Sequence, residues 1–198
     1  MDYFTADLHF NHKNIITYCD RNAHGDTARL FDNVGDMNEH IVNMWNLTVK
    51  DTDTVYLLGD VAFGSKDEAI ILCNRLKGRK ILIYGNHDLR CDEAYWKRAG
   101  FDEVHKLGYG QTMPYQEFFL SHYPYRKALT EYDTRDYLFE HAAESTPTIL
   151  LHGHVHTQWK FKENMINVGI DVWDYRPVSI KSIRYYAEGG PPLGNTPD

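Results

Sequence analysis

Five short apolar runs along the chain each end in side chains that can bind a metal ion. The runs are rich in Ile, Leu, Val and Phe, which is typical of buried strands. The polar residues at their ends are, in chain order, Asp7 with His9, Asp60, Asn86 with His87, His122, and His154 with His156. Strands of an α/β sheet present their carboxyl ends at one edge, where ligands bind. One strand that ends in Asp would mean little, but five in succession predict a single polar site.

Predicted strands alternate with predicted helices, which indicates an α/β protein. The strands cover residues 2–6, 55–58, 80–84, 117–121 and 148–151. Helices are expected over residues 11–20, 36–46, 92–99 and 133–144, between Ser65 and Gly78, and after Ser179. Residues 158–168 have the pattern of a hairpin, and the polar segment 21–35 is predicted to be a surface loop.

The chain of 198 residues shows no internal repeat and no linker, so residues 1–188 are predicted to form one domain. The tail at 189–198 is rich in Gly and Pro and is predicted to be disordered. The long interval between His9 and Asp60 leaves room for a small lid over the site, built from residues 11–50.

Charge and cysteine content narrow the class of protein. The net charge of −7 argues against a broad nonspecific nucleic-acid surface, which would be basic, but it is compatible with a nucleotide in a metal-loaded pocket. The three cysteines, Cys19, Cys73 and Cys91, form no C-x-x-C pair and indicate reduced thiols. We see no signal peptide and no apolar stretch long enough to span a membrane. We therefore expect a cytoplasmic protein without a membrane partner.

The residue types at the strand ends indicate which metals would bind. Asp7 and His9 stand two positions apart, so on a strand both side chains would point to one face, and His154 and His156 repeat that spacing. Oxygen and imidazole ligands without thiolate suit Mn, Fe, Zn, Co or Ni. Seven candidate ligands are more than one ion needs, which predicts two ions that share a carboxylate.

Five blocks carry a resemblance to a known family. They are Asp7-Leu8-His9, Gly59-Asp60, Gly85-Asn86-His87-Asp88, Ser121-His122, and Gly153-His154-Val155-His156. This order, D-x-H, G-D, G-N-H-D, H and G-H-x-H, resembles that of the calcineurin-like metallophosphoesterases, in particular their small bacterial and phage members. The resemblance implies a four-layer αββα sandwich of two mixed sheets flanked by helices.

The resemblance also implies a role for each residue of the blocks. One ion would be held by Asp7, His9, Asp60 and His156. The other would be held by Asp60, Asn86, His122 and His154, with Asp60 bridging. A hydroxide between the ions would attack phosphorus in line, and His87 would protonate the leaving oxygen. We expect manganese, with iron, zinc, nickel or cobalt as alternatives.

Other residues near the blocks have open roles. Asp88 either supports a ligand and its turn or caps a helix. His12 and Arg126, together with the ligand Asn86, are candidates for contact with the substrate phosphate, although a solvated loop would explain His12 and a surface arginine would explain Arg126. His152 is expected to face the sheet rather than a metal. Asp171 is mostly core or turn, with a chance of supporting the site.

The leading hypothesis is a phosphoric ester hydrolase that acts on a small phosphate ester or a nucleotide, with a phosphodiesterase favoured over a phosphomonoesterase. Two other hypotheses are kept. A nuclease is disfavoured by the acidic charge, and a non-catalytic protein-binding scaffold on the same fold is disfavoured because every ligand and His87 are present.

Overall fold

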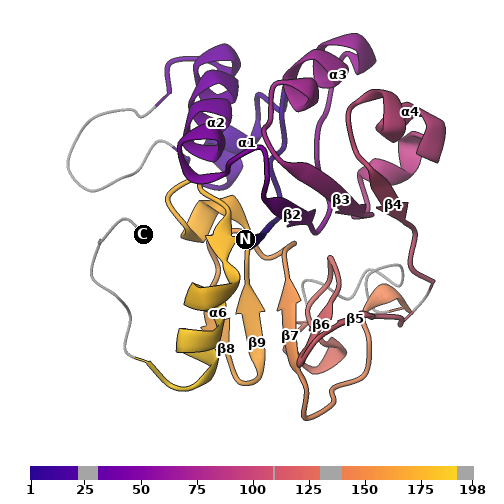
Figure 1. Cartoon of the computed structure of the whole chain (residues 1–198), viewed down its shortest axis with the longest axis vertical. Coiled ribbons are helices and arrows are strands. Elements are labelled where there is room, and N and C mark those ends of the chain that lie inside the picture. The colour runs from indigo at the N-terminus through magenta and orange to yellow at the C-terminus, as the bar shows by residue number, and fades with distance from the viewer. Residues whose placement is uncertain (22–30, 109, 130–139, 191–198) are drawn as a thin grey trace.

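Two five-stranded sheets form the centre of the molecule. A computed structural model describes residues 1–21, 31–108, 110–129 and 140–190 (Figure 1). In spatial order, the first sheet contains β10 (Val178–Ser179), β1 (Asp2–Thr5), β2 (Thr54–Leu57), β3 (Arg79–Ile83) and β4 (Glu103–His105). The second contains β5 (Met113–Tyr115), β6 (Phe118–Leu120), β7 (Ile149–His152), β9 (Met165–Asn167) and β8 (Phe161–Lys162).

Both sheets are mixed. In the first, β1 to β4 are parallel and β10 joins β1 antiparallel. In the second, β6, β7 and β9 are parallel, and the edge strands β5 and β8 are antiparallel to their neighbours. The pair β8–β9 is the predicted hairpin. The predicted architecture of two mixed sheets flanked by helices is confirmed.

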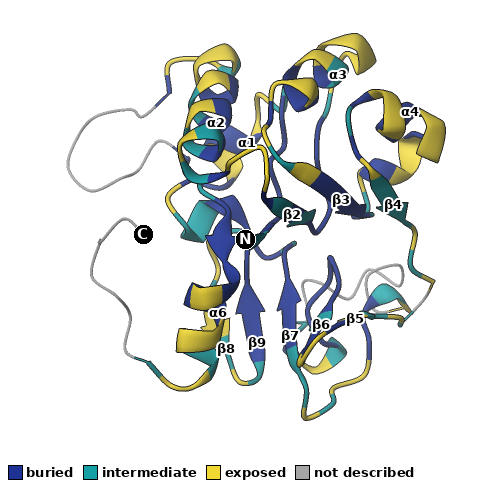
Figure 2. Cartoon of the chain, in the orientation of Figure 1, coloured by how far each residue is buried: buried dark blue, intermediate teal, exposed yellow. Residues whose placement is uncertain are grey.

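The α-helices lie mainly on the outer face of the first sheet (Figure 1). They are α1 (Ile15–Tyr18), α2 (Val34–Thr48), α3 (Lys66–Asn74), α4 (Glu93–Arg98) and, after the last strand, α6 (Ile180–Ala187). Three 3₁₀ turns accompany them: η1 (Asp88–Arg90), η2 (Arg126–Ala128) and η4 (Ile170–Val172). The outward faces of α2, α3 and α4 are exposed and their inward faces are buried (Figure 2).

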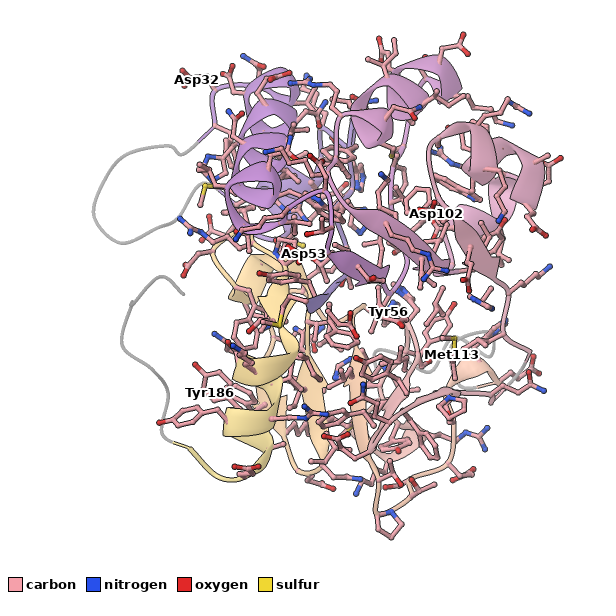
Figure 3. All side chains as sticks on the ribbon, in the orientation of Figure 1. Asp32, Asp53, Tyr56, Asp102, Met113 and Tyr186 are labelled. Atoms are coloured by element: carbon pink, nitrogen blue, oxygen red, sulfur yellow. The ribbon has the colours of Figure 1, made fainter. Side chains whose placement is uncertain are left out.

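Two apolar clusters hold these layers together. Beneath the helices, Trp45 of α2 and Trp96 of α4 pack in one buried cluster with Leu57 and Leu82 of the sheet. Between the sheets, a second cluster receives residues of both, and Tyr56 of β2 and Met113 of β5, labelled in Figure 3, pack against it. The clusters fix the two sheets face to face, so the loops at their strand ends are held in a constant relation.

Serine and aspartate N-caps start three of the helices. The Ser65 hydroxyl accepts a hydrogen bond from the N–H of Glu68, 3.3 Å away, at the start of α3. Ser179 caps α6 in the same way, through the N–H of Ser182. Asp92 caps α4 through the N–H of Tyr95. Each cap satisfies one backbone donor that the first helical turn leaves without a partner.

Several predictions of local structure need correction. The helix expected over 11–20 is only the four-residue α1, since Asn11 and Asp20, at its two ends, have left-handed backbone angles, φ 62° and 47°. The segment 21–35 is not simply a surface loop, because Arg21 and Phe31 are 1% and 3% exposed. Strands β4, β5 and β10 were not predicted; they have two or three residues each, too few for a periodic pattern.

Other predictions fall on residues outside the described ranges. They are most of the helix expected at 133–144, most of the tail at 189–198 and residues 22–30 of the region proposed as a lid. Within that region, α2 packs Met37, Ile41 and Trp45 into the cluster beneath the helices. Among the helices of the described ranges, none combines the length and the apolar character needed to cross a membrane.

Candidate metal centre

The predicted ligands meet where the two sheets adjoin. The first sheet supplies Asp7, His9, Asp60 and Asn86, from the loops after β1, β2 and β3. The second supplies His122, His154 and His156, from the loops after β6 and β7. The two groups are joined directly, because the N–H of His154 donates to Asp7 Oδ2 over 2.9 Å. Residues that lie far apart in the chain thus form one cluster.

Asp60 lies at the centre of this cluster. Its Oδ2 is 3.6 Å from Nε2 of His9 on one side and 3.5 Å from Nε2 of His122 on the other. The Nε2 of His122 is also 3.1 Å from Asn86 Oδ1 and 3.3 Å from Nδ1 of His154. One carboxylate therefore adjoins two separate sets of donor atoms.

A second set of donor atoms surrounds His9. Ligand atoms of Asp7, His9 and His156 lie within 4.8 Å of one another, as do those of Asp7, Asp60 and His122. Oxygen and imidazole donors of this kind suit divalent first-row metals. These two groups contain five of the seven residues that the sequence assigned to ions, and Asp7 belongs to both groups.

Two buried atoms of the cluster give an independent test of fit to a cation. Within the described part of the chain, Asp7 Oδ1 and His9 Nε2 are buried without a hydrogen-bond partner. An unsatisfied buried polar atom costs about 1–3 kcal/mol. A divalent cation beside both atoms would remove that cost, so the residues present fit a metal ion.

Burial sets the protonation of the cluster in the absence of cations. It raises the pKa of Asp7 to about 7 and also raises that of Asp60. It lowers the pKa of His122 to about 3, and that of His9 well below its ordinary value. The imidazoles of His9 and His122 are therefore neutral and have a lone pair for a metal. Bound cations would favour the ionised carboxylates.

The backbone at the ligands is in the left-handed region. Asp7, His9, Asp60, His154 and His156 have φ angles of 59°, 50°, 58°, 73° and 47°. The prediction that the D-x-H and H-x-H pairs share a face because they lie on strands is wrong, since β1 ends at Thr5 and β7 at His152. Tight left-handed turns bring the side chains together instead. Such angles cost of order 1–3 kcal/mol each and cluster at functional sites.

Close approach explains the glycines of the motifs. A Cβ on Gly85 would lie 2.3 Å from Asp60 Oδ1, and one on Gly153 would lie 2.5 Å from Asp7 Oδ2. Real Cβ atoms do not come so near another heavy atom. Both glycines therefore leave space for a carboxylate of the cluster.

The role of Asp88, which the sequence left open, is clear from its hydrogen bonds. Its carboxylate is fully buried and accepts from the backbone N–H groups of Asp60, Val61 and Gly85, at 2.7, 3.0 and 2.8 Å. The residue at the N-cap of η1 is His87, not Asp88. Asp88 thus joins the loops after β2 and β3, which present Asp60 and Asn86.

A buried ion pair behind the cluster was missed by sequence reasoning. Arg21 Nε donates to Asp171 Oδ1 over 2.7 Å, and its two terminal nitrogens donate to the carbonyls of Leu8 and Asp7. Asp171 Oδ2 lies 2.8 Å from His156 Nδ1, so Nε2 is the nitrogen of His156 that would bind a metal. Burial lowers the pKa of His156, but the charge of Asp7 and the hydrogen bond to Asp171 raise it well above its ordinary value, so a metal at Nε2 would displace a proton. Asp171 thus contacts a proposed ligand, as a supporting residue would. No motif signals Arg21, which lies in a polar stretch.

The other candidates lie at different places. His12 is at the cluster: its Nδ1 is 3.3 Å from Nδ1 of His9, and its ring stacks on Phe63 with centroids 4.0 Å apart. Arg126 forms an ion pair with Glu144 and donates to the carbonyl of Ala142. His152 is buried, with Nδ1 2.7 Å from the carbonyl oxygen of Gly153 and its ring against Trp159. The substrate contact predicted for Arg126 gains no support from these partners.

Comparison with known proteins agrees with this geometry. A family model described as calcineurin-like phosphoesterase matches residues 3–173. Uncharacterized protein MJ1445 of Methanocaldococcus jannaschii is 31% identical over 202 residues, covering 95% of this chain and 92% of that protein. The Gene 66 protein of Mycobacterium phage L5 is 29% identical over 193 residues, covering 86% of each. The crystal structure of AQ665 from Aquifex aeolicus, a protein of unknown function, superposes with a TM-score of 0.64 at 28% identity, covering 94% of this chain and 98% of that one.

Proposed function

Because this chain belongs to the calcineurin-like phosphoesterase family, we propose that it is a phosphoric ester hydrolase that uses two divalent metal ions. Members of the family generally hydrolyse phosphoester bonds with such ions, although the family includes non-catalytic proteins. The observation that carries the proposal is the position of Asp60, whose Oδ2 lies 3.6 Å from Nε2 of His9 and 3.5 Å from Nε2 of His122. A carboxylate in that position is suited to bridge two ions.

The proposed ligand sets keep the roles given by the family resemblance. Asp7, His9, Asp60 and His156 would hold one ion, and Asp60, Asn86, His122 and His154 would hold the other. When bound, the ions supply positive charge that stabilises the reacting phosphate and lowers the pKa of water to near neutrality. Manganese is the first metal to test, with iron, zinc, nickel and cobalt as alternatives.

His87 is the proposed general acid. Its side chain is 43% exposed, unlike the buried His9 and His122, and its Nε2 lies 3.9 Å from Asp60 Oδ2. Its backbone N–H donates to Asp60 Oδ1 over 3.0 Å, which fixes the imidazole beside the cluster. An exposed imidazole at this place can hold a proton at Nε2 and donate it to the leaving oxygen of a substrate.

A phosphodiester is the proposed substrate class, with a small ester or a nucleotide as the organic part. A phosphomonoester is the alternative. The scaffold hypothesis requires missing ligands, and here all seven ligand residues and His87 are present. A nuclease that holds long nucleic acid would need a basic surface, and the net charge of −7 disfavours it.

The test is hydrolysis of two chromogenic esters in parallel. Bis-p-nitrophenyl phosphate reports diesterase activity and p-nitrophenyl phosphate reports monoesterase activity, each after chelator treatment and reconstitution with Mn, Fe, Zn, Ni or Co. We expect metal-dependent turnover, faster with the diester. If protein that is folded by circular dichroism turns over neither ester with any metal, the enzyme proposal is overturned. If the monoester is turned over faster, the proposed phosphodiesterase is instead a phosphomonoesterase.

A further inference from the structure

A cavity of about 660 Å³ lies beside the metal centre, between the turn after β3, helix α4 and the end of β4. Basic side chains from four elements line it: Lys66, Arg90, Arg98 and Lys106. All four are exposed. Among the described residues, two carboxylates, Asp92 and Glu93, line it with them. The cavity is therefore a local excess of positive charge on an acidic chain.

The four cations lack acidic partners within the described ranges. Other surface arginines, such as Arg75, Arg79 and Arg184, form ion pairs with Glu39, Glu103 and Glu117. None of the four cavity cations forms an ion pair with a carboxylate of the described residues. Two of them are instead held by Tyr95, with Lys66 Nζ and the Arg98 guanidinium 5.7 and 5.9 Å from the ring centroid. Arg90 donates to the carbonyl oxygen of Ala62, and its guanidinium lies 5.3 Å from the ring centroid of Phe63. Lys66, Arg98 and Lys106 are therefore the cations whose charge is available to an anion.

The cavity adjoins the metal centre. A smaller cavity, about 40 Å³, is lined by Gly85 and His122 of the centre, and it shares Tyr84, Leu89 and Lys106 with the larger one. Leu89, which is 40% exposed, gives the wall shared by the two cavities an apolar part. The Arg90 guanidinium lies 5.3 Å from the ring centroid of Phe63, which is 4.6 Å from the ring centroid of His87, so Arg90 is near the proposed acid.

We infer that the cavity binds a second phosphate group of the substrate, and that the substrate is a phosphorylated nucleotide or short oligonucleotide. The inference rests on the proposed function. The ester to be cleaved lies at the metal centre, a nucleoside passes over Tyr84 and Leu89, and the next phosphate reaches Arg98 and Lys106. Aromatic and apolar contacts combined with cations are the usual means of holding single nucleotides. The cavity is local, so it does not require a basic surface over the whole protein.

The test uses matched p-nitrophenyl esters of thymidine. One pair is thymidine 5′-(p-nitrophenyl phosphate) with and without a 3′-phosphate. The second pair is thymidine 3′-(p-nitrophenyl phosphate) with and without a 5′-phosphate. We expect the extra phosphate to raise kcat/KM about tenfold, equivalent to about 1.4 kcal/mol, in one of the pairs. In Arg98→Gln and Lys106→Gln the ratio within that pair should fall towards one. In the control Lys181→Gln, an exposed lysine of α6, it should stay unchanged.

A binding measurement separates this inference from the proposed function. Thymidine 3′,5′-bisphosphate is titrated calorimetrically into chelator-treated protein. Binding that Arg98→Gln and Lys106→Gln each weaken severalfold, and Lys181→Gln does not, supports the cavity even if no ester is hydrolysed. The inference is overturned if the bisphosphate does not bind, or if neither cavity variant weakens its binding. It is also overturned if the protein hydrolyses bis-p-nitrophenyl phosphate but the extra phosphate does not raise kcat/KM in either thymidine pair. Equal kcat/KM for a dinucleotide and for longer oligonucleotides would show that the substrate is a single phosphorylated nucleotide. A kcat/KM that rises with chain length would show that the substrate is a short oligonucleotide.

Discussion

Oδ2 of Asp88 accepts a hydrogen bond from the backbone N–H of Asp60 over 2.7 Å, so a residue that touches no proposed metal position fixes the carboxylate at the centre of the site. The same oxygen accepts from Gly85, and Oδ1 accepts from Val61. Since all three donors are backbone groups, Asp88 determines the path of two loops.

Asp88→Asn tests this role. An asparagine keeps one acceptor and turns the other into a donor that faces backbone N–H groups, so a buried donor is left without a partner. We expect a loss of about 1–3 kcal/mol in the free energy of unfolding, measured by urea denaturation in chelator. Metal affinity, measured by calorimetry with Mn, should fall about 10–100-fold. The control is Asp92→Ala, which removes the cap of α4, costs about 1 kcal/mol and keeps metal affinity. Unchanged affinity in Asp88→Asn would contradict the role.

Asp60→Asn tests the bridge. The substitution removes the negative charge that both proposed ion positions share, so both ions should bind more weakly. The measurement is metal content by mass spectrometry after dialysis against a limiting metal concentration. Asp102→Asn, at a carboxylate that accepts the N–H of Lys80, is the control and should retain both ions. Two ions per chain in Asp60→Asn would show that Asp60 does not bridge.

His87→Ala tests the general acid. Because His87 is not a proposed ligand, the variant should keep its metal content while kcat for the phosphodiester falls about 10²–10⁴-fold. His105→Ala removes a half-exposed imidazole of β4 and should leave kcat unchanged. Loss of an ion from His87→Ala would mean that the residue is a ligand, and an unchanged kcat would mean that it is not the acid.

Asp171→Asn and Arg21→Met test the ion pair behind His156. Arg21→Met leaves the 1% exposed carboxylate of Asp171 without its cation, and breaking a buried pair in this way costs about 3–5 kcal/mol. Asp171→Asn should lower metal affinity about 10–100-fold, because Nδ1 of His156 loses its acceptor. Urea denaturation and metal titration measure the two effects. An Arg21→Met protein as stable as the parent would refute the first expectation, and unchanged affinity in Asp171→Asn the second.

Gly153→Ala tests the close approach of the loop after β7. The added Cβ would lie 2.4 Å from Cβ of Ala6 and 2.5 Å from Oδ2 of Asp7, so the loop must move away from β1. We expect a loss of about 1–3 kcal/mol, as for other overpacked sites, together with weaker metal binding. Gly189→Ala is the control. Its new Cβ would meet nothing within 4 Å, so the only expected loss of stability comes from the strain of an alanine at φ 84°. Full metal affinity in Gly153→Ala would contradict the expectation.

The sequence predicted the ligand cluster because its members follow strand ends. Buried strands show as apolar runs, and the residue after each run is identified without any tertiary information. The same reasoning assigned Asp7 and His9 to a strand face, which was wrong, since apolar periodicity does not report left-handed φ angles. The prediction that these residues meet was therefore right, and the prediction of the backbone conformation at Asp7 and His9 was wrong.

The sequence did not predict contacts between residues that are distant in the chain and belong to no common motif. Arg21 lies in a polar stretch, and only the fold turns it inward to reach Asp171, 150 positions away. The four cations of the cavity come from the start of α3, η1, the end of α4 and the residue after β4, and no spacing links them. Short strands such as β4 and β5 were missed because three residues are too few to establish a period.

The position of the cluster where the two sheets adjoin gives the proposed ions a role as reversible cross-links. Asp7 and His154 are separated by 147 positions in the chain. An ion bound by ligands from both regions would therefore close a long loop of the unfolded chain. Closing a loop of about 100 residues by a covalent bridge is worth about 4–5 kcal/mol. Because metal binding is in equilibrium, this cross-link forms in proportion to the free metal concentration. The cohesion of the two sheets would therefore follow the metal supply of the surroundings.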